Sequence, residues 1–195
     1  MDEIIKVEAK YVFLDVVGYT NETIEAQFEI VQELQVIVKK SIRVLYFFGS
    51  LSDHVWYLPT GDGICVALVG DKRDDIHMLV ALEVLNQLSE HNRTGKQRFS
   101  IRIGVNENKD IVYWDINSKK NFAGRGINFA QRFMNLADSG QIVVGPSVFE
   151  KLGQTNKYNG KFKEYFVTLK HNKKIQAYQF VDASLPFLNS AEIDI

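Results

Sequence analysis

Two long helical patterns, each set between short apolar runs, constrain the fold of this sequence most strongly. Between residues 24 and 45, apolar side chains recur at steps of three and four, which predicts a long amphipathic helix. A second such pattern runs over residues 76–88. An apolar run at residues 10–17 precedes the first helix, and the runs VWYLP and ICVALV flank the turn sequence TGDG between the two helices. The first half of the chain is therefore predicted to run strand, helix, strand, strand, helix.

The second half adds strands and shorter helices. We predict strands at 98–106, 111–116, 140–145, 161–169 and 174–181, a helix at 124–137, and a short helix at 146–152 that opens on a proline. The first six elements have the β-α-β-β-α-β order of ferredoxin-like folds. We therefore expect an α+β fold with a ferredoxin-like core and C-terminal additions, in a single domain over residues 1–195.

The composition argues against several classes of partner. The formal net charge is −1, so a clustered basic surface for nucleic acid is not expected. The chain has no apolar stretch of roughly 18 residues, the length of a transmembrane helix, and we expect no direct membrane contact. Cys65 is the only cysteine, which rules out an intrachain disulfide, and the acidic N-terminus lacks a signal-peptide pattern. We therefore expect a cytoplasmic protein.

An aspartate interrupts the first apolar run. Asp15 stands between Leu14 and Val16, and no lysine or arginine lies within four residues on either side. A buried carboxylate is costly unless something pairs with it, so its partner lies elsewhere in the chain or is not protein. Asp62, in the TGDG turn, is the candidate neighbour, because the hairpin strands lie beside the first strand in a β-α-β-β sheet.

A divalent metal would resolve the repulsion between Asp15 and Asp62. Two carboxylates with open positions for water and phosphate are how Mg²⁺ or Mn²⁺ is held at phosphoryl-transfer sites. Gly18, Tyr19 and Thr20 follow the first aspartate and are expected to open the long helix, whose N-terminal amides form an anion site for a substrate phosphate. For Asp62 alone, a simple turn residue remains the alternative.

Asn128 and Arg132 are four residues apart and share one face of the predicted helix in GRGINFAQRF. The guanidinium of Arg132 suits the oxygens of a reacting phosphorus centre, and Asn128 could fix a ribose. The alternative is an ordinary salt bridge for Arg132 and a solvated face for Asn128.

Four motifs together resemble the catalytic domain of class III nucleotidyl cyclases, the adenylate and guanylate cyclases. They are FLDVVGYT, PTGDGICVAL, GRGINFAQRF and SGQIVVGPSVFEKL, in this order. The resemblance implies that Asp15, Asp62 and the backbone of Val16 bind two Mn²⁺ or Mg²⁺ ions. It also implies that a ribose 3′-hydroxyl attacks the α-phosphorus and pyrophosphate leaves.

The resemblance assigns further roles within that site. Arg132 matches the transition-state arginine and Asn128 the ribose-orienting asparagine. Lys109 falls roughly where some members carry a basic residue for phosphate. Because family sites form between two subunits, we expect a head-to-tail homodimer with two active sites.

The positions that select the base do not match a purine enzyme. Leu58 stands four residues before Asp62, where adenylate cyclases place a lysine and guanylate cyclases a glutamate. Asn121 stands seven before Asn128, where adenylate cyclases place an aspartate or threonine. A leucine cannot hydrogen-bond a purine ring nitrogen, and Tyr57 beside it could narrow the pocket.

In these respects the chain resembles the bacterial anti-phage pyrimidine cyclases of Pycsar type. That resemblance implies conversion of UTP to cyclic UMP as a second messenger for a separate effector. Cyclic CMP from CTP is the first alternative. A purine cyclase and an inactive nucleotide-binding signalling module are others, although retention of Asp15, Asp62, Asn128 and Arg132 argues against an inactive module. A diguanylate-cyclase-like domain fits poorly, because its GGDEF-type turn is missing.

Overall fold

The computed structural model describes residues 5–46, 54–169 and 173–193. Its elements are β1 (Ile5–Val16), the 3₁₀ helix η1 (Tyr19–Asn21), α1 (Ile24–Leu45), β2 (Val55–Pro59), β3 (Gly63–Val69), α2 (Ile76–Thr94), β4 (Ile101–Trp114), β5 (Lys120–Ala123), α3 (Arg125–Met134), β6 (Ile142–Val144), α4 (Pro146–Leu152), β7 (Phe162–Leu169) and β8 (Lys173–Phe180). The predicted α+β class and the β-α-β-β-α-β order of the first six main elements are confirmed.

One mixed sheet joins the strands of the described ranges. Its order is β2-β3-β1-β4-β6-β8-β7, and β5 pairs with β4 beside this path. The first four positions give the strand order of a ferredoxin-like core, with the hairpin β2-β3 antiparallel to β1. The prediction that the hairpin lies beside the first strand is therefore confirmed.

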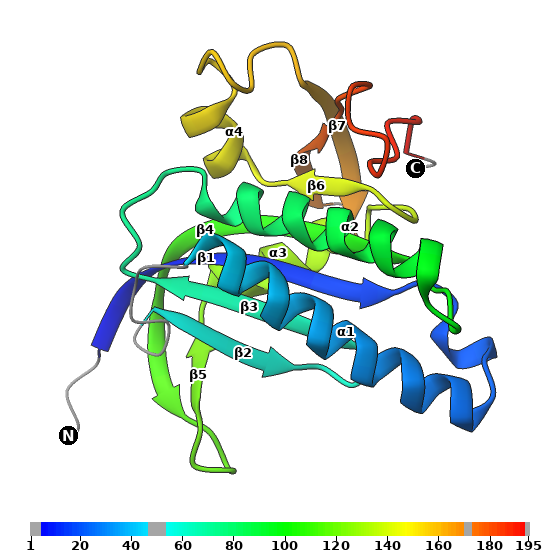
Figure 1. Cartoon of the computed structure of the whole chain (residues 1–195). Coiled ribbons are helices and arrows are strands. Elements are labelled where there is room, and N and C mark those ends of the chain that lie inside the picture. Colours follow the sequence, from blue (N-terminus) through cyan, green and yellow to red (C-terminus); the bar gives the residue numbers. More distant parts are fainter. Residues whose placement is uncertain (1–4, 47–53, 170–172, 194–195) are drawn as a thin grey trace.

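The helices lie on both faces of the sheet. Helices α1 and α2 cross one face, and α3 lies on the other (Figure 1). Alternate residues of β1 point to opposite faces of the sheet. Val12, Leu14 and Val16 pack under α1 and α2. Tyr11 and Phe13 pack toward α3. No described helix has the length and hydrophobicity that crossing a membrane requires.

The N-terminal half of α1 differs from its predicted role. The helix runs over Ile24–Leu45, in agreement with the periodicity, but Ile24 and Phe28 are 81% and 66% exposed. These residues belong to the predicted apolar stripe. They lie outside the core because the first turns of α1 project past the end of the sheet (Figure 1).

The centre of the chain contains one strand where two were expected. The predicted strands at 98–106 and 111–116 are parts of a single strand, β4, and an unexpected strand, β5, pairs back onto it. The polar stretch NENKD does not interrupt β4, because its side chains find partners on both faces of the sheet. The helix predicted at 124–137 is shorter and ends at Met134.

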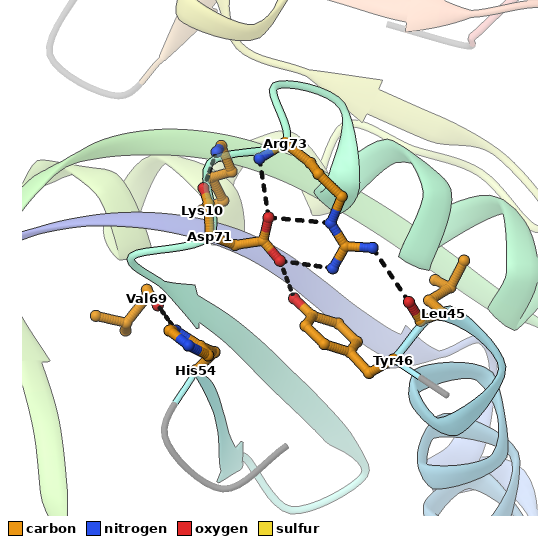
Figure 2. A network of polar contacts seen from close by, with 7 residues as sticks. All are labelled: Lys10, Leu45, Tyr46, His54, Val69, Asp71 and Arg73. Carbon is orange, nitrogen blue, oxygen red and sulfur yellow. Dashed lines mark hydrogen bonds and ion pairs between the residues drawn. The ribbon is translucent and has the colours of Figure 1, made fainter. Parts of the chain in front are cut away.

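A polar network ties the end of α1 to the loop before α2 (Figure 2). The carboxylate of Asp71 accepts hydrogen bonds from Arg73 Nη2 and Tyr46 Oη, both at 2.6 Å. Arg73 Nη1 donates to the carbonyl of Leu45 at 3.1 Å, and Lys10 Nζ donates to the carbonyl of Asp71 at 2.7 Å. Burial raises the pKa of Asp71, but the hydrogen bonds from Arg73 and Tyr46 outweigh it and hold that pKa well below its usual range.

Asp71→Asn is expected to lower the free energy of unfolding at pH 7 by about 1–2 kcal/mol. This value allows for the solvent screening of the ion pair with Arg73, whose side chain is exposed. A carboxyl group whose pKa is depressed by folding stabilises above its unfolded pKa, and this contribution fades as pH falls through the folded value. The difference between variant and wild type should therefore shrink below about pH 4. Denaturant unfolding at pH 7 and pH 3 measures it, with the exposed Asp74→Asn as the control. Equal effects of the two variants at pH 7 would contradict the assignment.

Candidate active site

The two predicted metal aspartates are held at the same end of the sheet. Asp15 is the second-last residue of β1 and lies directly opposite Gly63, the first residue of β3. Asp62 immediately precedes Gly63 in the chain. A Cβ atom on Gly63 would lie 2.3 Å from the carbonyl oxygen of Leu14, so only glycine allows β3 to approach this closely. The structure therefore brings Asp15 and Asp62 to neighbouring positions, as the sequence predicted.

Arg102 is the protein partner of Asp15. It lies directly opposite Asp15 on β4, and its Nε and Nη2 atoms donate to Asp15 Oδ2 at 2.9 and 2.7 Å. Both bonds end on Oδ2. The other carboxylate oxygen, Oδ1, accepts no hydrogen bond from the described residues. Sequence reasoning gave Arg102 no role. The available signal was a single arginine between Ile101 and Ile103, in the apolar first part of the strand.

The donor set around Asp15 fits a hard divalent ion. Asp62 is half-buried and, like Asp15 Oδ1, accepts no hydrogen bond from the part of the chain that the structure describes. The same residues contain no group of three or more His, Cys, Asp or Glu side chains placed to hold a metal. An ion here would therefore take two carboxylates, backbone oxygen such as that of Val16, and oxygens of water or substrate. This is the ligand type that Mg²⁺ and Mn²⁺ prefer.

The segment after Asp15 differs in detail from the prediction. Gly18, Tyr19 and Thr20 do not open α1: Gly18 has φ 74° and leads into η1, and α1 begins at Ile24 after the cap Thr23. The reason is local, because the Thr23 hydroxyl accepts a hydrogen bond from the amide of Ala26 and so defines a later helix start.

One groove nevertheless joins this segment to the second aspartate. Tyr19, Thr20 and Asp62 line a groove of about 580 Å³ together with exposed apolar side chains of α1. Two of the predicted phosphate-binding residues, Tyr19 and Thr20, thus face the same groove as the predicted metal ligand Asp62, and Gly18 is not among the residues that line it.

Asn128 and Arg132 lie on one exposed face of α3. Asn128 Nδ2 donates to the carbonyl of Gly124 at 2.7 Å. The Arg132 guanidinium lies 5.1 Å from the ring centre of Phe129 and forms no ion pair with any described residue. An ordinary salt bridge, the alternative for Arg132, is therefore not present in the described residues. No hydrogen bond or ion pair joins Asn128 or Arg132 to the aspartates of the same chain, among the residues described.

Lys109 lies away from both groups. Lys109 lies on β4 and pairs with Glu8 of β1. It is seven residues beyond Arg102, which corresponds to roughly 23 Å along the strand. Its neighbours Asn108 and Asp110 face α3, and Lys109 lines a polar pocket with Lys10 and Ser147 on the other side of the sheet. The structure therefore does not bring Lys109 to either half of the predicted site within one chain.

The predicted base-selecting residues face different layers. Tyr57 lines an apolar pocket of about 330 Å³ against α1. Leu58 packs on the opposite face, in the cluster that contains Trp56, Phe122 and Ile127. Trp56 and Phe122 stack with ring centres 5.0 Å apart. Of the two neighbours, Leu58 is therefore the residue on the same side of the sheet as α3.

Asn121 lies on β5 opposite Tyr113, beside this apolar cluster. Its Oδ1 accepts a hydrogen bond from the amide of Phe122 at 2.8 Å, which leaves the Nδ2 group as its donor.

The sequence matches the family described as "Adenylate and Guanylate cyclase catalytic domain" over residues 7–182. The chain therefore belongs to this family of nucleotide cyclase catalytic domains. Among curated proteins, a sequence search found no match.

Solved structures of cyclase domains have the same fold. The guanylyl cyclase Cya2 has 16% identity and a TM-score of 0.72, with 96% of this chain and 99% of that chain covered. The guanylate cyclase domain of RhGC from Catenaria anguillulae, solved with GTP, has 19% identity and a TM-score of 0.68, with 91% and 98% covered. The adenylyl cyclase CyaB from P. aeruginosa has 15% identity and a TM-score of 0.63, with 93% and 97% covered.

Proposed function

We propose that this chain is a single catalytic domain that converts UTP to 3′,5′-cyclic UMP and pyrophosphate. The observation that carries the choice of base is Leu58. It packs in an apolar cluster on the α3 side of the sheet, at the position where purine cyclases present a charged side chain to the base. A site without a hydrogen-bonding group there leaves a purine edge unpaired, and such a loss discriminates strongly against that base. CTP is the alternative substrate, because Nδ2 of Asn121 can donate and Oδ1, which accepts from the amide of Phe122, keeps a second lone pair.

The residues divide the chemistry between the two halves of the site. Asp15, Asp62 and the Val16 backbone would hold Mn²⁺ or Mg²⁺, two ions per site, which supply Lewis-acid stabilisation of charge on the ribose oxygen and the phosphates. Arg102 fixes Oδ2 of Asp15, so that Oδ1 and Asp62 remain available as ligands. The loop at Tyr19 and Thr20 lies where a triphosphate could extend from that position.

The other half supports the reacting centre. Arg132 donates to the oxygens of the α-phosphorus as negative charge builds there, and Asn128 orients the ribose. The O3′–P bond forms as the bond to pyrophosphate breaks, and the proton of the 3′-hydroxyl is lost to solvent. Gln131, the exposed residue just before Arg132, also lies within a turn of Asn128, but it carries no charge to offer the phosphorus centre, and we assign it no part in the reaction.

A head-to-tail homodimer would unite the two halves. Among the described residues of one chain, Asn128 and Arg132 form no bond to the aspartates. They lie on α3, across the sheet from the groove that Asp62 shares with α1 (Figure 1), which supports a second copy completing each site. Exposed apolar side chains support such an interface: Tyr113, Trp114 and Ile116 at the β4–β5 hairpin are 43%, 67% and 99% exposed. The hairpin extends away from the sheet (Figure 1), as an arm that contacts another chain would.

The proposed biological role rests on the resemblance to the anti-phage pyrimidine cyclases. A cyclic pyrimidine nucleotide made in the cytoplasm would serve as a second messenger in defence against phage. It would act on a separate effector that binds the nucleotide, and this chain itself would bind neither nucleic acid nor membrane.

A competition assay tests the substrate. The purified protein is incubated with Mn²⁺ and equal concentrations of ATP, GTP, CTP and UTP, and the products are separated by mass. We expect cyclic UMP as the main product. Cyclic CMP would move the assignment to the cytidylate alternative, and cyclic AMP or cyclic GMP as the main product would overturn the pyrimidine proposal. An assay without product under any condition would favour the inactive nucleotide-binding module.

A further inference from the structure

Asp110 is a buried carboxylate without a cationic partner. It is 2% exposed, lies on β4 and forms no ion pair with any described residue. Four hydrogen bonds satisfy it. Oδ1 accepts from Asn108 Nδ2 and from the amide of Gly126, both at 3.1 Å, and Oδ2 accepts from Tyr11 Oη at 2.9 Å and from the amide of Ile127 at 3.1 Å.

Two of these donors belong to the first turn of α3. The residue at the N-cap position, Gly124, has no side chain that could accept from these amides. The carboxylate of Asp110, on the neighbouring strand β4, takes the place of that cap. The first turn of a helix exposes unpaired amides and carries partial positive charge, which compensates a buried carboxylate. A second strand residue holds the same turn, because Asn106 Nδ2 donates to the carbonyl of Gly126 at 3.0 Å.

The glycines of the GRG sequence are needed for this contact. A Cβ atom on Gly124 would lie 2.1 Å from Asp110 Oδ1, and one on Gly126 would lie 2.6 Å from Asp110 Oδ2 and from Tyr11 Cε2. Both positions are therefore restricted to glycine by the close approach of the carboxylate.

Asp110 can influence the predicted catalytic side chains of α3 through the backbone at the start of that helix. Asn128 is bonded to the carbonyl of Gly124, the residue that lies against Asp110. Arg132 follows one turn later on the same face of α3. Tyr11 lies on β1, the strand that carries Asp15, so the cap also fixes α3 relative to that strand.

We propose that Asp110, with Tyr11 as its hydrogen-bond donor, is a positioning residue that sets the place of Asn128 and Arg132 for nucleotide cyclisation. This inference rests on the proposed function. Burial and the nearby Asp110 carboxylate raise the pKa of Tyr11, so its hydroxyl remains a donor at physiological pH. Neither Asp110 nor Tyr11 contacts the nucleotide in this assignment; both act through α3.

The test compares Tyr11→Phe with a matched control, Tyr158→Phe. Tyr158 is also buried and also donates to an aspartate before a helix, Asp75 Oδ2 before α2, at 3.0 Å. Each variant removes one buried hydroxyl and one hydrogen bond, so the two should lose similar global stability. Only Tyr11→Phe should loosen the first turn of α3. Asp110→Asn is a stronger variant, because an amide cannot accept from both helix amides and from Tyr11 together.

Two readouts are needed. Hydrogen exchange measured by mass spectrometry on the full-length protein reports the first turn of α3, and steady-state kinetics report kcat and KM. We expect Tyr11→Phe to raise exchange there by roughly 2–10-fold, the effect of one buried hydrogen bond, and to lower kcat by a similar factor with KM little changed. Tyr158→Phe should change neither.

Each result has a defined meaning. Unchanged exchange in α3, or an equal loss of kcat in Tyr158→Phe, would overturn the proposal, and so would raised exchange with a wild-type kcat. If the wild-type protein makes no cyclic nucleotide, the proposed function fails, and hydrogen exchange alone decides whether Asp110 positions α3. Tyr11→Phe keeps the test decisive if Asp110→Asn does not fold.

Discussion

Asp62→Asn is expected to abolish nucleotide cyclisation while leaving the protein folded. The substitution keeps the size of the side chain but removes the negative charge that a divalent ion needs at this position. Asp62 forms no hydrogen bond with any described residue, so the folded state loses no internal contact. We therefore expect a change in stability within about 0.5 kcal/mol, the usual range for such surface positions.

Two measurements separate this result from a general loss of structure. Thermal unfolding should match the wild type, whereas Mn²⁺ binding, followed by titration in the presence of a non-reactive UTP analogue, should weaken markedly. Asp74→Asn, an exposed aspartate in the loop before α2, makes the same change of charge and should leave turnover intact. Near-normal turnover in Asp62→Asn would show that Asp62 is only the turn residue that its GDG context also allows.

The fold was predictable where each residue pattern has one structural meaning. The apolar periodicity predicted the extent of α1, although the helix starts after the cap Thr23 and not at residues 18–20. The turn TGDG predicted the hairpin, because the glycines and the flanking apolar runs agree. From that order alone, Asp15 and Asp62 were expected to be neighbours. The structure confirms that their strands are adjacent.

The sequence was less informative where polar side chains are buried. Residues 107–110 fell between two predicted strands, yet Asn106, Asn108 and Asp110 alternate along the continuous strand β4. Their side chains form hydrogen bonds with the start of α3 or with each other. The Arg102 pair with Asp15 also depends on strand register, which periodicity does not give. The sequence also left open whether Tyr57 or Leu58 faces the base, and the packing shows only that Leu58 lies on the α3 side of the sheet and Tyr57 on the α1 side.

Arg132→Ala is expected to lower kcat by roughly 10²–10³, the scale of a lost transition-state donor, with a much smaller effect on KM. Removing the side chain also loses its contact with the Phe129 ring, which at an exposed site contributes only about 0.5–1 kcal/mol to stability. Arg132→Lys tests geometry, since a lysine keeps the charge but not the two parallel donors. Gln131→Ala, at the exposed position just before Arg132, is the control: it removes a neutral polar side chain from the same turn of the helix and should keep wild-type kinetics. A loss below about threefold in Arg132→Ala would remove Arg132 from the reacting centre.

The two inactive variants together test whether each site is built from two chains. Arg132→Ala retains the aspartates, and Asp62→Asn retains the intact α3 face. In a head-to-tail dimer, a mixed pair contains one site with both defects and one site with neither. Random exchange of subunits makes half of the dimers mixed, so mixing equal amounts should restore about a quarter of wild-type activity. If both halves of the site belonged to the same chain, no mixture of the two variants would recover any activity.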